Sequence, residues 1–139
     1  MGIGIGIEIE GEDDLYQKGI DTLNSDLFAH IIMDISEGND TVTNMLADKY
    51  GFSLENLGKV GSDENSEIGP WQDPIDAWEE AYALFDAFAK EGTELLGKEI
   101  SYYPVDVEMI PAYMKTLSEA ITILKYAHEK KKNIRLCFC

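Results

Sequence analysis

Histidine and carboxylate side chains are the groups best placed to do chemistry, and their most regular arrangement lies in residues 26–34. Asp26, His30 and Asp34 are spaced i, i+4 and i+8, so a helix would place all three on one face. Carboxylate and imidazole groups bind several divalent metals. The outer two residues would, however, lie about 12 Å apart along the helix, too far for one ion to touch both. We therefore interpret the row as a solvent-exposed polar face and predict no metal site.

The two cysteines, Cys137 and Cys139, offer no better site. A Cys-x-Cys pair on a strand does not match the usual ligand spacing of structural zinc sites. No neighbouring base would activate either thiol as a nucleophile. A disulfide between such close positions is awkward. We expect no cofactor. We also expect no disulfide framework, and the alternating start does not resemble a signal core, so a cytoplasmic location is favoured.

Carboxylates are abundant, but none of them forms a recognisable catalytic pair. Asp13-Asp14, Asp63-Glu64 and Glu79-Glu80 are sequence neighbours, which on a helix point apart. The acidic stretch 62–67 lacks the alternating ligands and central glycine of an EF-hand. No nucleophile elbow, P-loop or zinc-protease motif occurs, so no catalytic residue is predicted. The sequence favours a non-enzymatic role and leaves an enzyme open as the less favoured class.

The negative charge is concentrated in the first part of the chain. Residues 1–80 carry 19 acidic side chains and three lysines, whereas residues 81–139 carry eight acidic and eight basic side chains. The whole net charge of −16 therefore belongs to the first 80 residues. Such a field repels nucleic acid and anionic membranes and attracts basic surfaces. The alternative interpretation is that the charge only keeps the protein in solution.

Two strands are predicted, one at each end of the sequence. Residues 2–10 alternate strictly, with Ile3, Ile5, Ile7 and Ile9 on one face and Gly2, Gly4 and Gly6 on the other. Residues 133–139 alternate again, with Ile134, Leu136 and Phe138 on the inner face. A phosphate-binding glycine loop needs its glycines between a strand and a helix, so this pattern does not predict nucleotide binding. We expect the two strands to pair in one small sheet.

Helices are predicted for most of the chain between the strands. The ranges are 13–23, 25–36 with Ser25 as N-cap, 40–50 ending at Gly51, 73–92 ending at Gly92, and 111–131. Residues 53–57 add one turn, and residues 98–103 read as a short extended segment. The helix at 73–92 opens with Asp73-Pro74, a strong start signal. Its expected buried stripe runs through Ile75, Trp78, Tyr82, Phe85 and Ala89, widened by Ala81, Leu84 and Phe88.

These elements predict a single compact domain over residues 1–139. The hydrophobic content of 45% is sufficient for a packed core. The expected fold class is α+β or α/β, helix-rich, with four to five helices covering the small sheet. No run of about 18 apolar residues occurs, so no membrane span is expected. Residues 58–74 are predicted to form a long acidic loop, and such loops are often functional.

The leading hypothesis is a small acidic protein that binds a basic surface on a partner protein. A nuclease, another nucleic-acid-handling protein or a defence effector offers such a surface. We therefore expect an inhibitor or an immunity-type protein. A more specific form of this hypothesis is nucleic-acid mimicry, in which the carboxylates are spaced like phosphates. No motif assigns the chain to a family, and direct nucleic-acid binding is not expected. The candidate partner-binding residues are acids of the loop and helices plus one tryptophan: Asp63, Glu64, Glu67, Trp71, Asp76, Glu79, Glu80, Asp26 and Asp34.

The alternative is a small-molecule- or metal-binding domain, which could be an enzyme. Its cleft would lie near the glycine-rich strand and the 58–74 loop. Trp71 could either hold that loop on the core or be offered to a partner. Unpaired strand edges also make a homodimer a third expectation.

Overall fold

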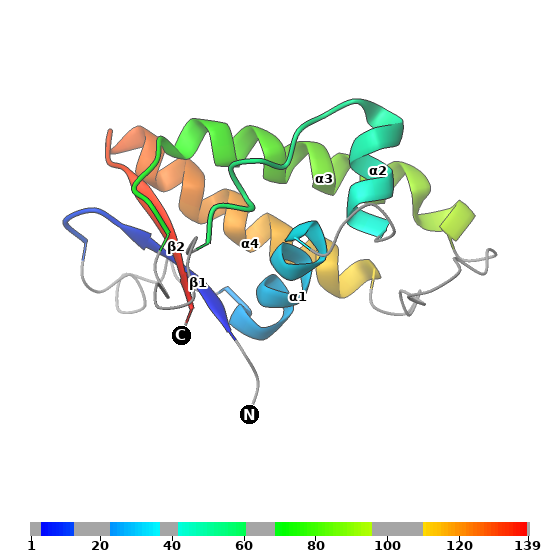
Figure 1. The fold of residues 1–139 in the computed structure, drawn as a ribbon, viewed down its shortest axis with the longest axis horizontal. Coiled ribbons are helices and arrows are strands. Elements are labelled where there is room, and N and C mark those ends of the chain that lie inside the picture. The colour runs from blue at the N-terminus through cyan, green and yellow to red at the C-terminus, as the bar shows by residue number, and fades with distance from the viewer. Residues whose placement is uncertain (1–3, 13–22, 37–41, 61–68, 96–109, 139) are drawn as a thin grey trace.

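The computed structural model describes residues 4–12, 23–36, 42–60, 69–95 and 110–138. These contain four helices and two strands, in the order β1 (Ile5–Ile9), α1 (Ser25–Ser36), α2 (Val42–Tyr50), α3 (Pro74–Leu95), α4 (Ile110–Glu129) and β2 (Ile134–Phe138). The fold is α+β and helix-rich, as predicted (Figure 1). The expected helix at 13–23 and extended segment at 98–103 fall almost entirely outside the described residues. None of the helices in the described ranges is long and apolar enough to cross a membrane.

The sheet confirms the predicted pairing of the two distant strands. β1 and β2 are antiparallel, in a register that runs from Ile5 opposite Phe138 to Ile9 opposite Ile134. The alternation decides which face is buried, because Ile5, Ile7 and Ile9 all point into the core beside Ile134 and Leu136. A two-stranded sheet is only marginally stable alone, so the helices that cover its apolar face stabilise it.

The outer edge of β2 is covered by the two ends of the 58–74 segment. The N–H of Gly69 donates to the carbonyl of Leu136 at 2.8 Å, and Gln72 and Ile134 exchange two backbone hydrogen bonds of 2.8 and 2.9 Å. Val60 forms a further bridge with Leu136. The described ends of this segment are therefore fixed to the sheet, and residues 61–68 lie outside the described ranges.

The core lies mainly between α3 and α4, which run side by side in opposite directions (Figure 1). Alanine residues at the contact let the two helices approach closely. The side chains that α3 and α4 bury include Ala77, Ala81, Leu84, Phe88, Leu117, Ala120, Ile123, Leu124 and Ala127. α1 packs on β1 and α4, and α2 connects α1 to α3.

The predicted buried stripe of α3 is confirmed in part, because Ala81, Leu84 and Phe88 are buried and Trp78 and Phe85 pack partly buried against the core. Tyr82 was expected inside but is 54% exposed, and Ala89 is exposed as well, whereas Ala77 is fully buried. The helix is apolar over much of its circumference, so several stripes fit the sequence. The close approach of α4 selects the face with the alanines.

Three predicted helix boundaries also change. Asn24 caps α1 instead of Ser25, since its Oδ1 accepts the N–H of Leu27 at 3.1 Å. α3 continues through Gly92 to Leu95, because a glycine that keeps helical backbone angles weakens a helix without ending it. α4 ends at Glu129, two residues before the predicted end. The predicted start of α3 is confirmed, with Asp73 Oδ1 accepting the N–H of Ile75 at 3.0 Å.

A buried carboxylate joins α2 to α3. Glu91 accepts hydrogen bonds from the hydroxyl of Tyr50, at 2.7 Å, and from the ammonium group of Lys49. The hydrogen bond to Glu91 raises the pKa of Tyr50. Two donors from α2 therefore compensate the negative charge of the Glu91 carboxylate, as burial of a charge requires.

The end of α4 has a backbone conformation that its residue type does not favour. Lys131 has φ 57°, in the left-handed region. Its N–H donates to the carbonyl of His128 at 3.1 Å, and the N–H of Lys132 donates to that of Ala127 at 3.0 Å. This pair of bonds is the Schellman motif, whose left-handed position usually holds glycine. A side chain there strains the backbone.

Replacing Lys131 by glycine is expected to stabilise the fold. Relief of the left-handed strain exceeds the entropy that glycine adds to the unfolded chain, for a net gain of about 0.5–1 kcal/mol in the free energy of unfolding. Urea denaturation measures this gain. Lys130→Gly is the matched control and should be destabilising, because Lys130 lacks a positive φ. Equal effects of the two substitutions would contradict the interpretation.

Candidate functional site

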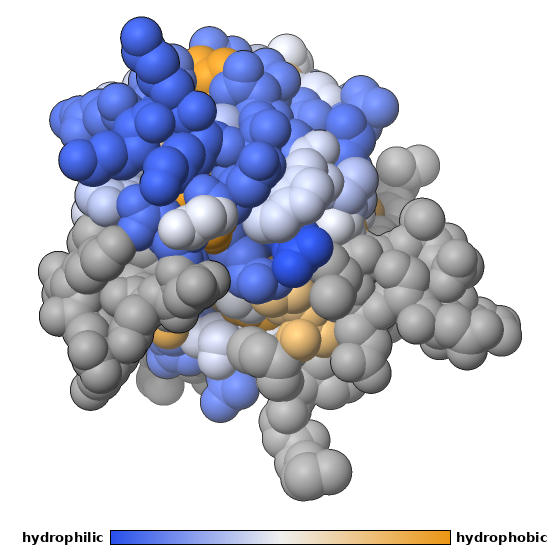
Figure 2. Space-filling model, turned by 90° about the vertical axis from the view of Figure 1, so that its left-hand side faces the viewer, coloured by the Kyte–Doolittle hydropathy of each residue, from blue (hydrophilic) through white to orange (hydrophobic). Residues whose placement is uncertain are grey.

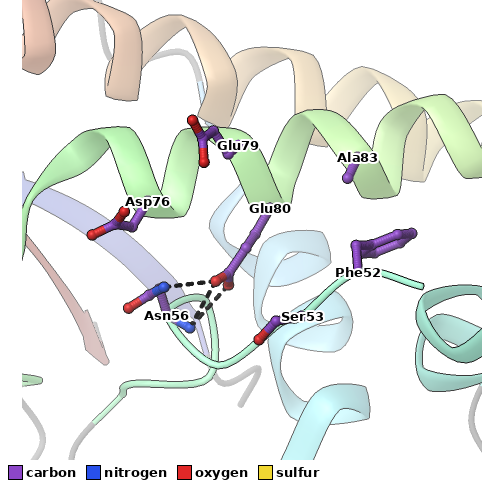
Figure 3. A pocket seen from close by; sticks show the side chains of 7 residues that line it. All are labelled: Phe52, Ser53, Asn56, Asp76, Glu79, Glu80 and Ala83. Carbon is purple, nitrogen blue, oxygen red and sulfur yellow. Dashed lines mark hydrogen bonds between the residues drawn. The ribbon is translucent and has the colours of Figure 1, made fainter. Parts of the chain in front are cut away.

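A hollow of about 220 Å³ lies between the first turns of α3 and the chain at residues 52–56. We call it the acidic hollow. Three of its lining residues carry carboxylates, and two carry apolar side chains (Figure 3). The full lining is Phe52, Ser53, Asn56, Asp76, Glu79, Glu80 and Ala83.

Glu80 forms the inner wall of the acidic hollow and holds the turn at residues 54–58. It is only 8% exposed. Its Oε1 accepts the backbone N–H groups of Asn56 at 2.9 Å and Leu57 at 3.0 Å, and its Oε2 accepts the Asn56 amide Nδ2 at 2.7 Å. Burial raises the pKa of Glu80, and these donors oppose the rise. Its carboxylate is therefore occupied by the protein itself, and we leave Glu80 out of the exposed binding surface.

Asp76 and Glu79 form the exposed margin of the acidic hollow. Figure 3 shows Glu80 reaching from α3 to Asn56, whereas Glu79 points away from the turn. Glu55 is also exposed and close enough to Glu80 to raise its pKa. In the described part of the chain, none of these three exposed carboxylates takes part in an ion pair. Lys59 approaches from one side, with its Nζ 2.9 Å from Asn56 Oδ1.

Sequence reasoning identified the acids of this site and missed their neighbours. Asp76, Glu79 and Glu80 were candidates, but Phe52, Ser53 and Asn56 were not. The available signal was the pair of adjacent glutamates, because consecutive helix positions point about 100° apart and so meet different surroundings. Nothing local shows that residues 52–56 pack against α3.

The remaining candidate residues do not join the acidic hollow. Asp26 and Asp34 lie on α1, the first exposed and the second half-buried. Asp63, Glu64 and Glu67 fall outside the described residues. Trp71 is 41% exposed, and the guanidinium of Arg135 lies 4.2 Å from its ring centroid. Trp71 therefore packs against Arg135 of β2 and keeps part of its side chain exposed.

Part of the negative charge of the first 80 residues is paired with cations from the end of the chain. Arg135 lies opposite Glu8 in the sheet and bonds to it at 2.9 Å, and Lys132 bonds to Glu12 at 3.0 Å. The hydrogen bond from Arg135 holds the pKa of Glu8 below its usual value. These two pairs neutralise Glu8 and Glu12, whereas Asp76 and Glu79 at the acidic hollow are exposed and form no ion pair with any described residue.

The two histidines lie on different helices. His30 is exposed on α1, and His128 is exposed near the end of α4. Within the described ranges, no group of three or more histidine, cysteine, aspartate or glutamate side chains could hold a metal ion. Cys137 is half-buried, with its Sγ 3.9 Å from the carbonyl oxygen of Gly6.

Neither family models nor curated sequences nor solved structures match this chain.

Proposed function

We propose that this protein is a small, acidic, non-enzymatic binding protein that occupies a basic surface on a partner protein. The observation that carries the proposal is a set of three exposed carboxylates that form no ion pair with any described residue: Asp76 and Glu79, which line the acidic hollow, and Glu55 on the adjacent turn. Asp76 and Glu79 lie on α3 and Glu55 on the turn that Glu80 holds, so hydrogen bonds fix the backbone that carries all three carboxylates. Fixed charge patterns speed encounter with an oppositely charged surface and discriminate between partners.

The acidic hollow suits a lysine or arginine side chain of such a partner. These side chains have an apolar stem and a charged head. Phe52 and Ala83 supply apolar wall, and Asp76 and Glu79 supply negative charge at the margin. A basic side chain could therefore bury its stem between α3 and the turn while its head stays near the carboxylates.

The class of partner follows from the sign of the charge. A net charge of −16 disfavours direct binding of nucleic acid or anionic membranes. Proteins that themselves bind nucleic acid expose basic surfaces, so a nuclease or defence effector is the proposed target and an inhibitor or immunity-type role the proposed activity. If the carboxylates mimic phosphates, nucleic acid will compete with this protein for the target. A cytoplasmic location is part of the same proposal.

Capture of basic proteins by the immobilised chain, followed by affinity measurement with a purified captured partner, tests the proposal. Asp76→Asn combined with Glu79→Gln is expected to weaken the affinity about tenfold, because two interfacial charge pairs are lost. Raising the ionic strength from about 0.05 M to about 0.3 M should weaken binding by the parent chain further.

The matched control removes the same charge elsewhere. Asp48→Asn combined with Glu129→Gln neutralises two exposed acids on α2 and α4 that do not line the acidic hollow. This variant should bind the partner almost as tightly as the parent chain. Equal losses in both variants would show that only the overall charge matters and would overturn the proposed site.

A further inference from the structure

A second hollow, of about 340 Å³, lies where α3 begins and α4 ends. Its lining consists of Asp73, Pro74, His128, Lys131, Lys132 and Asn133. This end of the molecule faces the viewer in Figure 2, which shows mostly hydrophilic side chains over its upper part. In an acidic protein, the concentration of basic and amide groups around one hollow is unexpected. We call it the basic hollow.

Lys131 supplies the available positive charge of the basic hollow. The ammonium of Lys132 is bonded to Glu12 at 3.0 Å, and that of Lys130 lies 5.7 Å from the ring centroid of Tyr126. Lys131 is exposed, lines the hollow and has no ion-pair partner among the described residues. The three neighbouring lysines thus have three different environments, and one of them faces the hollow unpaired.

The backbone conformation of Lys131 also lowers the stability of the fold. The Schellman motif at the end of α4 places Lys131 at φ 57°, where glycine would be less strained. Strained residues of this kind tend to occur at functional sites, where the side chain has a use that offsets the strain. Strain alone does not define a site, but here the strained residue is also the one whose charge faces the hollow.

We propose that the basic hollow binds a small phosphate-bearing anion. The ammonium of Lys131, a ring nitrogen of His128 and the amide of Asn133 can all donate hydrogen bonds to phosphoryl oxygens. A volume of about 340 Å³ falls within the range of small-ligand sites. Carboxylates also lie at this hollow: Asp73 in its lining, Glu12 bonded to Lys132 at 3.0 Å, and Glu10, whose Oε2 accepts Asn133 Nδ2 at 3.4 Å. Acids beyond about 8 Å are screened at physiological ionic strength, and Lys131 is the lining cation that has no ion-pair partner among the described residues. This binding site is separate from the proposed partner surface.

Asp73 lies on the same hollow and should oppose the anion. Its carboxylate accepts the N–H of Ile75 as the cap of α3. Asparagine caps helices as well as aspartate does and carries no charge. Asp73→Asn is therefore expected to tighten anion binding without loss of the cap.

Titration with inorganic phosphate, followed by NMR of the backbone amides and of His128, tests the proposal in the full chain. Sodium chloride keeps the ionic strength fixed at about 0.15 M, and acetate serves as the monovalent comparison. We expect saturable shifts at His128, Lys131 and Asn133 with phosphate and weaker binding of acetate. Lys131→Gly should weaken phosphate binding about fivefold while the melting temperature stays equal or rises, and Asp73→Asn should tighten it about threefold.

The neighbouring lysine gives the matched control. Lys130→Gln removes the same charge from a side chain that does not line the hollow, and its effect on phosphate affinity should be less than about twofold. Linear, non-saturating shifts, equal losses from Lys130→Gln and Lys131→Gly, or equal affinity for acetate would each overturn the proposal. Because no variant in this series touches the acidic hollow, failure here would leave the proposed partner binding intact.

Discussion

Glu80→Ala is expected to lower the free energy of unfolding by about 3 kcal/mol. The substitution removes the acceptor for the backbone N–H groups of Asn56 and Leu57, which Glu80 now binds at 2.9 and 3.0 Å. Leu57 is fully buried, so water cannot readily replace the lost acceptor at its N–H. The turn at 54–58 should loosen, and with it the wall of the acidic hollow. Urea denaturation with fluorescence detection measures the loss.

The neighbouring glutamate provides the control for Glu80. Glu79 is exposed and forms no ion pair in the described part of the chain, so Glu79→Ala should change stability by less than about 0.5 kcal/mol. Glu80→Gln should fall between the two, because its amide keeps one acceptor oxygen and brings an N–H₂ group against donors. Similar stabilities for Glu79→Ala and Glu80→Ala would show that Glu80 does not hold the turn.

Gly69→Ala is expected to destabilise the protein by about 3 kcal/mol. A Cβ atom at this position would overlap the backbone carbonyl oxygen of Lys59 and lie 3.0 Å from that of Leu136. Both oxygens belong to backbone that is tied to the sheet, so neither can move aside alone. The bond from the N–H of Gly69 to Leu136 should be lost, and the segment should separate from β2. Thermal and urea denaturation measure the effect.

Gly58→Ala is the matched control for this close approach. A Cβ at Gly58 would meet its nearest neighbours at 3.4 and 3.5 Å, which is ordinary contact. This substitution should leave stability unchanged or raise it by up to about 1 kcal/mol, because alanine reduces the freedom of the unfolded chain. A loss at Gly58 as large as that at Gly69 would contradict the steric explanation.

The sequence predicted the fold where its patterns were local and strict. The alternating isoleucines of β1 and the alternating end of β2 each had one possible buried face, and the structure confirms their pairing. Asp73-Pro74 predicted the start of α3 from two residues alone, because aspartate caps a helix and proline suits its first position. The orientation of α3 was predictable only in part, because alanines and aromatics surround the helix and only the position of α4 selects among them.

The sequence predicted the acidic residues of the acidic hollow but not the contacts that shape it. Asp76 and Glu79 were identified because acidity is visible in composition. The role of Glu80 depends on Asn56 and Leu57, more than twenty positions away in the sequence, and no local pattern reports that contact. Arg135 and Lys132 likewise neutralise Glu8 and Glu12 only because the two strands pair across the chain. Long-range contacts of this kind decide which acids remain exposed.

The pairing of β1 with β2 also has a consequence for biosynthesis. Ile5 lies opposite Phe138 in the register, so the first strand is made long before its partner. α1, α2 and α3 can form while translation continues, but the ladder of β1 can be completed only after residue 138 has left the ribosome. Until then the isoleucines of β1 lack their strand partner, and a nascent chain that stalls late should be a better substrate for chaperones than the finished protein.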